Sequence, residues 1–309
     1  MQWLKKINIQ TRIILLVIIP LLATIALSVD KLNQALNEQS RMKDLDVILN
    51  YLNVTSPFIN NLSKETFFSR LYIDSRKDKV TFYQNKMLSA RSGAQEKQAA
   101  YATFLQQHQA ELVNFPVLKN RINEVQKLID RLPFIRQVAD KKQHMSKDYK
   151  EQVGKVIHTI YDMELVSKRL VTSLNEISVI ATQNEQLSLM SSAYYNLIEM
   201  SADSSILNGY IFSAVNTQMH PWTYAQIFST STKKEKYNQL FLSFAPESFK
   251  HKYNQILGNK DYQVAEKTAL LARSNVDATL FKPLDIKGVD WDKVTESVAL
   301  QYENILQVL

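Results

Sequence analysis

Three charged side chains interrupt an apolar helical stretch, LSKETFFSRLYI, at residues 62–73. They are Lys64, Glu65 and Arg70, and the question is whether they face solvent or a bound ligand. Glu65 and Arg70 are five residues apart, whereas an ion pair within a helix needs three or four. The spacing therefore favours a solvated helix surface. The alternative is that Arg70 faces a neighbouring helix, with Glu65 orienting it or pairing with another cation.

A second candidate is a row of polar residues that begins just before SSAYYNLIEMSADSSILNGY (191–210). Its members recur near helical spacing at Ser188, Ser191, Tyr195, Ser201, Ser205 and Asn208. Inside a bundle, Ser201 and Ser205 could offer hydroxyl groups to a small polar ligand. Serines in such rows more often let helices approach closely while they bond the carbonyl of the preceding turn. The pattern is thus more typical of packing than of binding.

The residue types argue against most catalytic chemistry. There is no cysteine, and the five histidines are scattered without an H-x-x-x-H pair, at positions 108, 144, 158, 220 and 251. No glycine-rich phosphate loop or nucleophile elbow occurs, and no two carboxylates form a recognisable catalytic pair. We therefore expect no catalytic residue, no metal site and no cofactor, and we expect that the protein is not an enzyme.

The net charge of +7 does not indicate a nucleic-acid-binding surface. Lys5, Lys6 and Arg12 lie before residue 30, and without them residues 30–309 carry a net charge of +4. This excess is spread along the chain in runs of mixed sign such as DSRKDK, which is typical of a solvated surface. We expect no nucleic-acid partner.

An apolar run, Ile13–Val29, follows these basic residues and includes Pro20. Its 17 residues are at the short end for a membrane-spanning helix and long for a signal-peptide core. The preceding positive charges predict a cytoplasmic N-terminus. A cleaved signal peptide, with Ala26 and Ser28 as a weak cleavage site, and a buried soluble helix are the alternatives. We favour a retained anchor in the bacterial inner membrane, with residues 30–309 in the periplasm or outside the cell.

Long helices are predicted for the remainder of the chain, because glycine (5) and proline (7) are scarce. A helix is expected to start at Pro57 and end near Asp74. Further helices are expected over Lys79–Leu88 and Gln95–Leu112, as one helix or two around Ser92-Gly93, and over Val117–Lys142, with a kink at Pro133. No strand of useful length is predicted.

The second half contains an apolar seam from Val156 to Ala181 with steps of four and three residues, which is typical of a helical bundle. We expect antiparallel helices over 147–181 and 185–218, with a turn in ATQNEQ (181–186); one unbroken helix is the alternative. Shorter helices follow, with Ser and Thr of STSTKK capping one, and the last is Trp291–Leu309. The predicted domains are a tip and anchor (1–29) and two helical bundles (30–145 and 146–309).

Five stretches carry a further pattern: LSKETFFSRLYI (62–73), KVIHTIYDMELVSK (155–168), YYNLIEMSADSSILNGYIFSAV (194–215), YNQLFLSFAPESFKHKY (237–253) and VDWDKVTESVALQYENILQVL (289–309). In this order they resemble the nitrate- and nitrite-sensing (NIT) domain family. The resemblance implies a sensor of two four-helix bundles that holds a small anion between helices with arginines. A guanidinium suits such a ligand because it presents several charge-assisted donors in one plane.

The sequence departs from the family pattern at those arginines. Glu65 matches the family glutamate, but Thr66 stands where its arginine would be, and Leu207-Asn208 stands where a second Glu-Arg pair is expected. Arg70 lies one helical turn after Thr66 and could substitute for the missing charge. Arg273 is a second candidate, because the resemblance implies a later family arginine in this segment.

The favoured hypothesis is an extracytoplasmic sensor of a small molecule or anion within a membrane-bound receptor: a chemoreceptor, histidine kinase or cyclic-dinucleotide enzyme. We expect a homodimer whose last helix leads into a second membrane span and a cytoplasmic output module beyond Leu309. Two alternatives remain. One is an anchored helical interaction or dimerisation module without a small ligand, and the other is a single four-helix bundle for amino acids.

Overall fold

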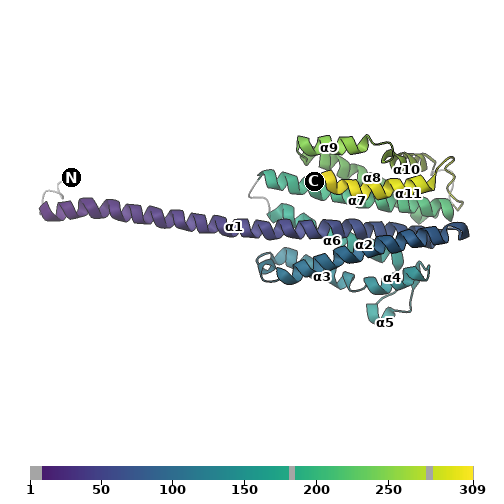
Figure 1. Ribbon diagram of the computed structural model, residues 1–309, viewed down its shortest axis with the longest axis horizontal. Coiled ribbons are helices and arrows are strands. Elements are labelled where there is room, and N and C mark those ends of the chain that lie inside the picture. Colours follow the sequence, from purple (N-terminus) through teal and green to yellow (C-terminus); the bar gives the residue numbers. More distant parts are fainter. Residues whose placement is uncertain (1–8, 181–184, 276–280, 309) are drawn as a thin grey trace. The chain divides into compact units, whose positions relative to one another are not determined.

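The computed structural model of the chain is built almost entirely from helices (Figure 1). It describes the backbone of residues 9–180, 185–275 and 281–308, and the side chains of residues 9–23, 25, 26, 178–180, 186 and 302–308 lie outside that description. The all-α prediction is confirmed. The chain divides into two compact units, Met1–Asn50 and Tyr51–Leu309. The predicted division into two bundles near residue 145 stays a prediction.

The first helix, α1, runs unbroken from Ile9 to Asp74. It passes through Pro57, so the predicted helix start there is wrong, while the predicted end at Asp74 is confirmed. A proline inside a helix removes one backbone bond. Here Phe58 and Ile59, which are fully buried beside it, hold the helix in place by packing. Burial of an amphipathic face outweighs the local preference.

Membrane crossing is not seen in the described part of the chain, where no helix is long and apolar enough to span a bilayer. The expected span Ile13–Val29, including Pro20, falls mainly on residues whose side chains lie outside the description. It stays a prediction.

The next helices follow a short 3-10 turn, η2 (Lys77–Lys79), and are α2 (Val80–Gln107), η3 (Glu111–Asn114), α3 (Pro116–Ile129) and α4 (Leu132–Asp140). α2 passes through Gly93, so of the two alternatives, one helix or two, the single helix is confirmed. A Cβ at Gly93 would lie 2.7 Å from Asn61 Oδ1, which shows how closely α1 and α2 approach. The helix predicted over Val117–Lys142 is broken rather than kinked, because Pro133 lies in the first turn of α4.

Two short strands precede the central helices. β1 (Met145–Ser146) pairs antiparallel with β2 (Ile157–His158) around α5 (Lys150–Val153). β1 lies just before the predicted helix 147–181, and β2 and α5 lie within it, so the helix starts only at α6 (Thr159–Ile180). Gly154 adopts a left-handed φ of 77° that ends α5, and this explains the late start.

The last five helices are α7 (Glu185–Asn216), α8 (Pro221–Phe244), α9 (Glu247–Leu257), α10 (Gln263–Asn275) and α11 (Trp291–Val308). The predicted turn at 181–186 falls mainly on residues 181–184, outside the described residues. The predicted cap in STSTKK is wrong, because α8 continues through it and Thr232 Oγ1 donates to the Phe228 carbonyl one turn earlier.

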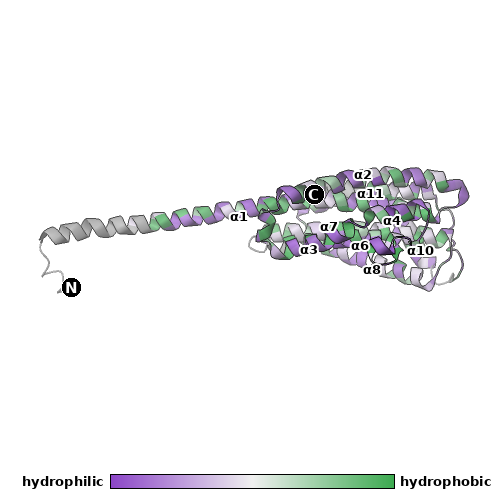
Figure 2. Cartoon of the chain, turned by 90° about the horizontal axis from the view of Figure 1, so that it is seen from below, coloured by the Kyte–Doolittle hydropathy of each residue, from purple (hydrophilic) through white to green (hydrophobic). Residues whose placement is uncertain are grey.

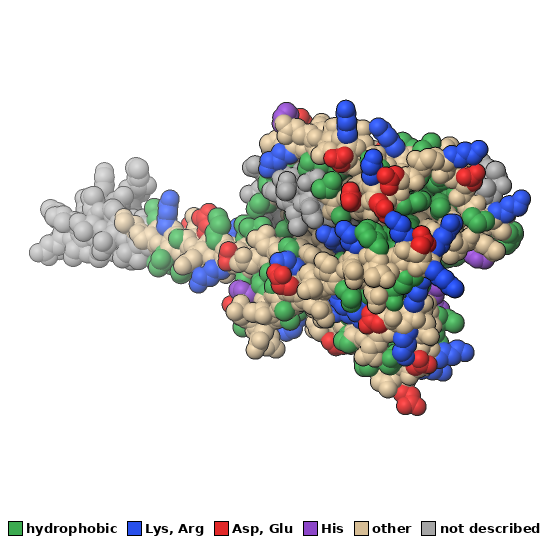
Figure 3. All heavy atoms as spheres, turned by 45° about the vertical axis from the view of Figure 1, so that its right-hand side comes forward, with side chains coloured by type: hydrophobic (Ala, Val, Ile, Leu, Met, Phe, Trp, Pro, Cys, Tyr) green, Lys and Arg blue, Asp and Glu red, His purple; other side chains and the backbone are tan. Residues whose placement is uncertain are grey.

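The packing of Tyr51–Leu309 makes α7 a central element, in contact with α6, α8, α10 and α11. A cluster of buried residues joins α7 to α8 and α10, including Leu207, Ile227 and Ala272. Apolar and polar residues alternate along these helices (Figure 2), as expected for helices that bury one face. On the face shown in Figure 3, Lys and Arg side chains are interspersed with Asp and Glu.

Candidate functional site

Glu65 is buried completely, and so the predicted solvated surface is wrong at this residue. Arg136 on α4 donates to both of its carboxylate oxygens, through Nε and Nη2 at 2.8 Å each. Arg91 on α2 donates to Oε1 at 3.1 Å and pairs with Asp140 at 2.8 Å. Glu65 thus pairs with other cations, as the alternative interpretation held, and joins α1 to α2 and α4. A buried carboxylate is tolerated because it is paired in this way.

Arg70 is also buried, with 8 % of its surface exposed, which corrects the surface interpretation. Its Nη2 donates to Glu164 Oε1 on α6 at 2.7 Å, and its guanidinium lies 4.2 Å from the centre of the Tyr210 ring on α7. Burial alone would lower the pKa of Arg70, but Glu164, Tyr210 and Asp74 outweigh it and raise that pKa. The charge of Arg70 is therefore neutralised within the protein rather than presented to a ligand.

The two positions at which the family resemblance implies arginines hold buried neutral residues. Thr66 Oγ1 donates to the Leu62 carbonyl at 2.7 Å, and Asn208 Nδ2 donates to the Ser204 carbonyl at 2.8 Å. Both side chains bond to their own helix. The arrangement offers no cation for an anion at either position.

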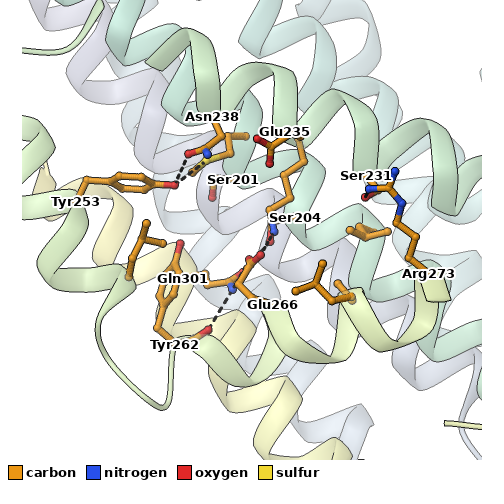
Figure 4. A pocket seen from close by; sticks show the side chains of 16 residues that line it. Ser201, Ser204, Ser231, Glu235, Asn238, Tyr253, Tyr262, Glu266, Arg273 and Gln301 are labelled. Atoms are coloured by element: carbon orange, nitrogen blue, oxygen red, sulfur yellow. Dashed lines mark hydrogen bonds and ion pairs between the residues drawn. The ribbon is translucent and has the colours of Figure 1, made fainter. Parts of the chain in front are cut away.

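A cavity of about 240 Å³ lies between α7, α8, α9, α10 and α11. Two predicted residues, Ser201 on α7 and Arg273 on α10, line it (Figure 4). Ser205 is buried on α7 but is not among the lining residues. Arg70 and Glu65 do not line it either. The structure therefore brings together only two of the five residues singled out from the sequence.

The cavity wall carries charges of both signs. Lys234 and Arg273 are the cations, and Glu235 and Glu266 are the anions. Lys234 on α8 forms an ion pair with Glu266 on α10. The guanidinium of Arg273 lies 3.5 Å from Ser231 Oγ and above the ring of Phe228.

A chain of hydrogen bonds links the cavity to the last helix. Ser204 Oγ on α7 donates to Gln301 Oε1 on α11 at 2.8 Å, and Gln301 Nε2 donates to Glu266 Oε1 at 3.2 Å. Through Glu266 the chain reaches Lys234 (Figure 4). Four helices thus contribute one connected set of polar groups.

Ser201 differs from its neighbours because its hydroxyl is buried at the cavity without a hydrogen-bond partner among the described residues. Only 3 % of this residue is exposed. Tyr253 OH nearby donates to Asn238 Oδ1 at 2.7 Å, and burial raises the pKa of Tyr253, which keeps its phenol neutral. A buried polar atom without a partner is costly, and a bound ligand can supply that partner.

Sequence reasoning missed Lys234, Glu266 and Gln301. Lys234 lies in the charged run STKKEKY, whose mixed charges were interpreted as solvated surface. Its partner Glu266 is 32 residues away, and Gln301 is 35 residues beyond Glu266. Periodicity within one helix carries no information about such pairs between helices. Within the described residues, no group of three His, Asp or Glu side chains could hold a metal ion.

The fold and the cavity together define a domain of long packed helices around a cavity that is lined by both polar and apolar side chains. The family model for nitrate and nitrite sensing matches residues 57–309, and the chain belongs to this family. Among solved structures, that of the NasR transcription antiterminator is similar, with a TM-score of 0.64 and 11 % sequence identity over 89 % of this chain and 71 % of that one. At this identity the similarity shows the fold alone. No curated protein sequence matches the chain.

Proposed function

We propose that the chain is the sensing part of a membrane-anchored bacterial signal-transduction receptor and that a small polar ligand binds in the cavity between α7, α8, α10 and α11. The observation that carries this proposal is the Ser201 hydroxyl, which is buried at the cavity without a partner. Membership of a sensing family supports it. The protein binds and signals, and catalyses no reaction.

The Arg70 region is the weaker candidate for this ligand. A guanidinium that already pairs with Glu164 at 2.7 Å and faces the Tyr210 ring has little left to offer an anion. In addition, the family arginine positions are occupied by Thr66 and Asn208. Binding a nitrate-like anion there would require Arg70 to leave a buried carboxylate unpaired, which is strongly unfavourable.

Signal transmission is proposed to use α11. Gln301 on this helix lies in the cavity and bonds to both α7 and α10, so a ligand that competes for these bonds shifts α11 relative to its neighbours. The proposed anchor, Ile13–Val29, places residues 30–309 in the periplasm or outside the cell. An output module beyond Leu309 would then receive the shift across the inner membrane.

Thermal shift measurements on the full chain in detergent test the proposal with nitrate, nitrite, small carboxylates and amino acids. At least one compound should raise the Tm of the wild type. Ser201→Ala should weaken that compound about tenfold, the value of roughly one hydrogen bond. Ser205→Ala is the matched control, since Ser205 lies on the same helix, is equally buried and does not line the cavity. The proposal would be contradicted if no compound raised the Tm, or if Ser201→Ala and Ser205→Ala weakened binding of the compound equally.

A second function, an interaction or dimerisation module, is favoured by one observation. α10 exposes two adjacent leucines, with 66 % of Leu270 and 47 % of Leu271 accessible to solvent. Leu270 also lines the cavity, so Leu271→Glu is the cleaner probe. Sedimentation should show that this substitution dissociates a dimer if the exposed face is an interface. A monomeric wild type at all concentrations would remove this candidate.

A further inference from the structure

From the charges of the cavity we infer that its ligand is a small zwitterion, a molecule that carries both an ammonium and a carboxylate, as a free amino acid does. The inference rests on the proposed function, because it names the ligand class of the same cavity. It differs from the anion that the family description suggests.

The charges on the cavity wall balance one another. The cavity contains two cations, Lys234 and Arg273, and two anions, Glu235 and Glu266. A simple anion such as nitrate would meet two carboxylates as well as two cations, and a simple cation would meet the reverse. A ligand with both charges can place each of them beside its opposite.

Only some of these charges are paired with each other. Lys234 and Glu266 form an ion pair with each other, and only 15 % of the Lys234 side chain is exposed. Among the described residues, neither Arg273 nor Glu235 takes part in an ion pair within 4.0 Å. Their bonds are to neutral groups: Arg273 donates to Ser231, and Glu235 Oε1 accepts from Gln239 Nε2 at 3.1 Å. One cation on α10 and one anion on α8 therefore lack a charged partner that a ligand can supply. Figure 4 shows Arg273 beside Ser231, with Glu235 at a separate place on the cavity wall.

The neutral polar groups and the size of the cavity also suit a small zwitterion. Ser201 offers an unpartnered hydroxyl, and Asn238 and Gln301 add amides from α8 and α11. The volume of about 240 Å³ lies below the roughly 300–1,000 Å³ of pockets for drug-sized ligands. A compact molecule with polar ends fits such a space. In this arrangement Arg273 binds the carboxylate of the ligand, Glu235 binds its ammonium, and the Ser201 hydroxyl forms a hydrogen bond with a polar group of the ligand.

The test uses isothermal titration of the full chain in detergent with the standard L-amino acids, each compared with its N-acetyl and carboxamide derivatives. We expect at least one amino acid to bind, and both of its derivatives to bind at least tenfold more weakly. Each derivative removes one charge and retains the other, so the pair reports whether both charges are recognised.

Two variants assign the charges to residues. Arg273→Gln should weaken binding of the amino acid at least tenfold but leave binding of the carboxamide unchanged, because the carboxamide has no carboxylate. Glu235→Gln should weaken binding of the amino acid at least tenfold but leave binding of the N-acetyl derivative unchanged, because that derivative has no ammonium. Both residues are exposed, so the fold should tolerate the changes. Lys236→Gln and Glu247→Gln are the controls, since these exposed residues do not line the cavity.

The outcomes separate this inference from the proposed function. One outcome is that nitrate, nitrite or a monocarboxylate binds, Ser201→Ala weakens that binding, and no amino acid binds. The inference of a zwitterionic ligand is then wrong, whereas the proposed sensing function of the cavity is retained. Equal binding of the amino acid and its derivatives would also overturn the zwitterion. If no compound binds at all, both the inference and the proposed function fail.

Discussion

Arg70 and Glu164 form a buried ion pair that holds α1 against α6. Removing one partner leaves the other charge buried, so Arg70→Met should lower the free energy of unfolding by about 3–5 kcal/mol. Arg70→Met with Glu164→Met should recover most of this loss, because neither partner of the pair is then left as an unpaired buried charge. Chemical denaturation followed by circular dichroism measures both.

The control for Arg70 is Arg121, which pairs with Glu124 and Glu176 but is 39 % exposed in its side chain. Arg121→Met should change the free energy of unfolding by less than about 1 kcal/mol. An Arg70→Met variant that is as stable as Arg121→Met would show that the Arg70–Glu164 pair is not buried as described.

Asp203 on α7 is a second residue whose charge is costly. Burial, followed by the nearby Glu199, raises the pKa of Asp203 to about 7. Lys233 and Lys168 act in the opposite direction but do not outweigh these effects. Its Oδ2 has no hydrogen-bond partner among the described residues. The folded state therefore holds this proton more tightly than the unfolded state does, and stability falls as the pH rises from about 4 to about 7.

Asp203→Asn removes that penalty. At pH 8 the variant should be more stable than the wild type by up to about 4 kcal/mol. The gain should shrink as the pH falls through 7 and vanish only below about pH 3, where the carboxyl is protonated in both states. Thermal unfolding at a series of pH values measures this. Asp285→Asn, at an exposed aspartate, should show no such trend. A gain independent of pH would point to packing instead of titration.

At the scale of the elements, the apolar periodicity predicted the C-terminal end of α1 at Asp74 and both ends of α11 to within about one residue. The errors have local causes. Pro57 lies inside α1 because flanking Phe58 and Ile59 are buried, and α8 continues through STSTKK. Periodicity within one segment reports which face is buried. It does not report what packs there, and that decides whether a weak breaker ends a helix.

The candidate site shows the same limit. The row of serines on α7 indicated Ser201, and the late arginine indicated Arg273, but Ser205 is packed elsewhere on the same helix. Glu65 and Arg70 were assigned to the surface because no partner lies within one helical turn. Their partners are on α2, α4 and α6, between 26 and 94 residues away. Sequence spacing cannot detect contacts of that kind.

Gly209 shows how closely two helices approach. A Cβ at this position would lie 2.8 Å from Arg70 Cδ and 3.0 Å from Nε, and Arg70 is fixed by Glu164. Gly209→Ala should therefore lower the free energy of unfolding by about 1–3 kcal/mol, despite the better helix propensity of alanine. Gly258→Ala is the control, because its Cβ would meet only ordinary contacts at 3.4 and 3.5 Å. Equal stability of the two variants would argue against tight packing of α1 on α7.

At the scale of the whole molecule, the proposed receptor depends on the anchor. The apolar run Ile13–Val29 follows Lys5, Lys6 and Arg12, which predicts a cytoplasmic N-terminus and an exported remainder. A sensor of external ligands requires that arrangement, because its cavity must open on the outside face. The ligand experiments above do not depend on it, so the anchor needs a test of its own.

Expression of the full chain in a Gram-negative bacterium, with alkaline phosphatase fused after Leu309, supplies this test. The enzyme is active only outside the cytoplasm, so the fusion should be active and should remain in the membrane fraction after an alkaline wash. Ile18→Lys with Leu22→Lys should release it from that fraction, since each lysine costs about 2.5–3.5 kcal/mol in the centre of a bilayer. Leu32→Lys with Leu36→Lys, at exposed positions with the same spacing, should leave it there. An inactive wild-type fusion in the soluble fraction would contradict the membrane receptor and leave the helical sensor without an anchor.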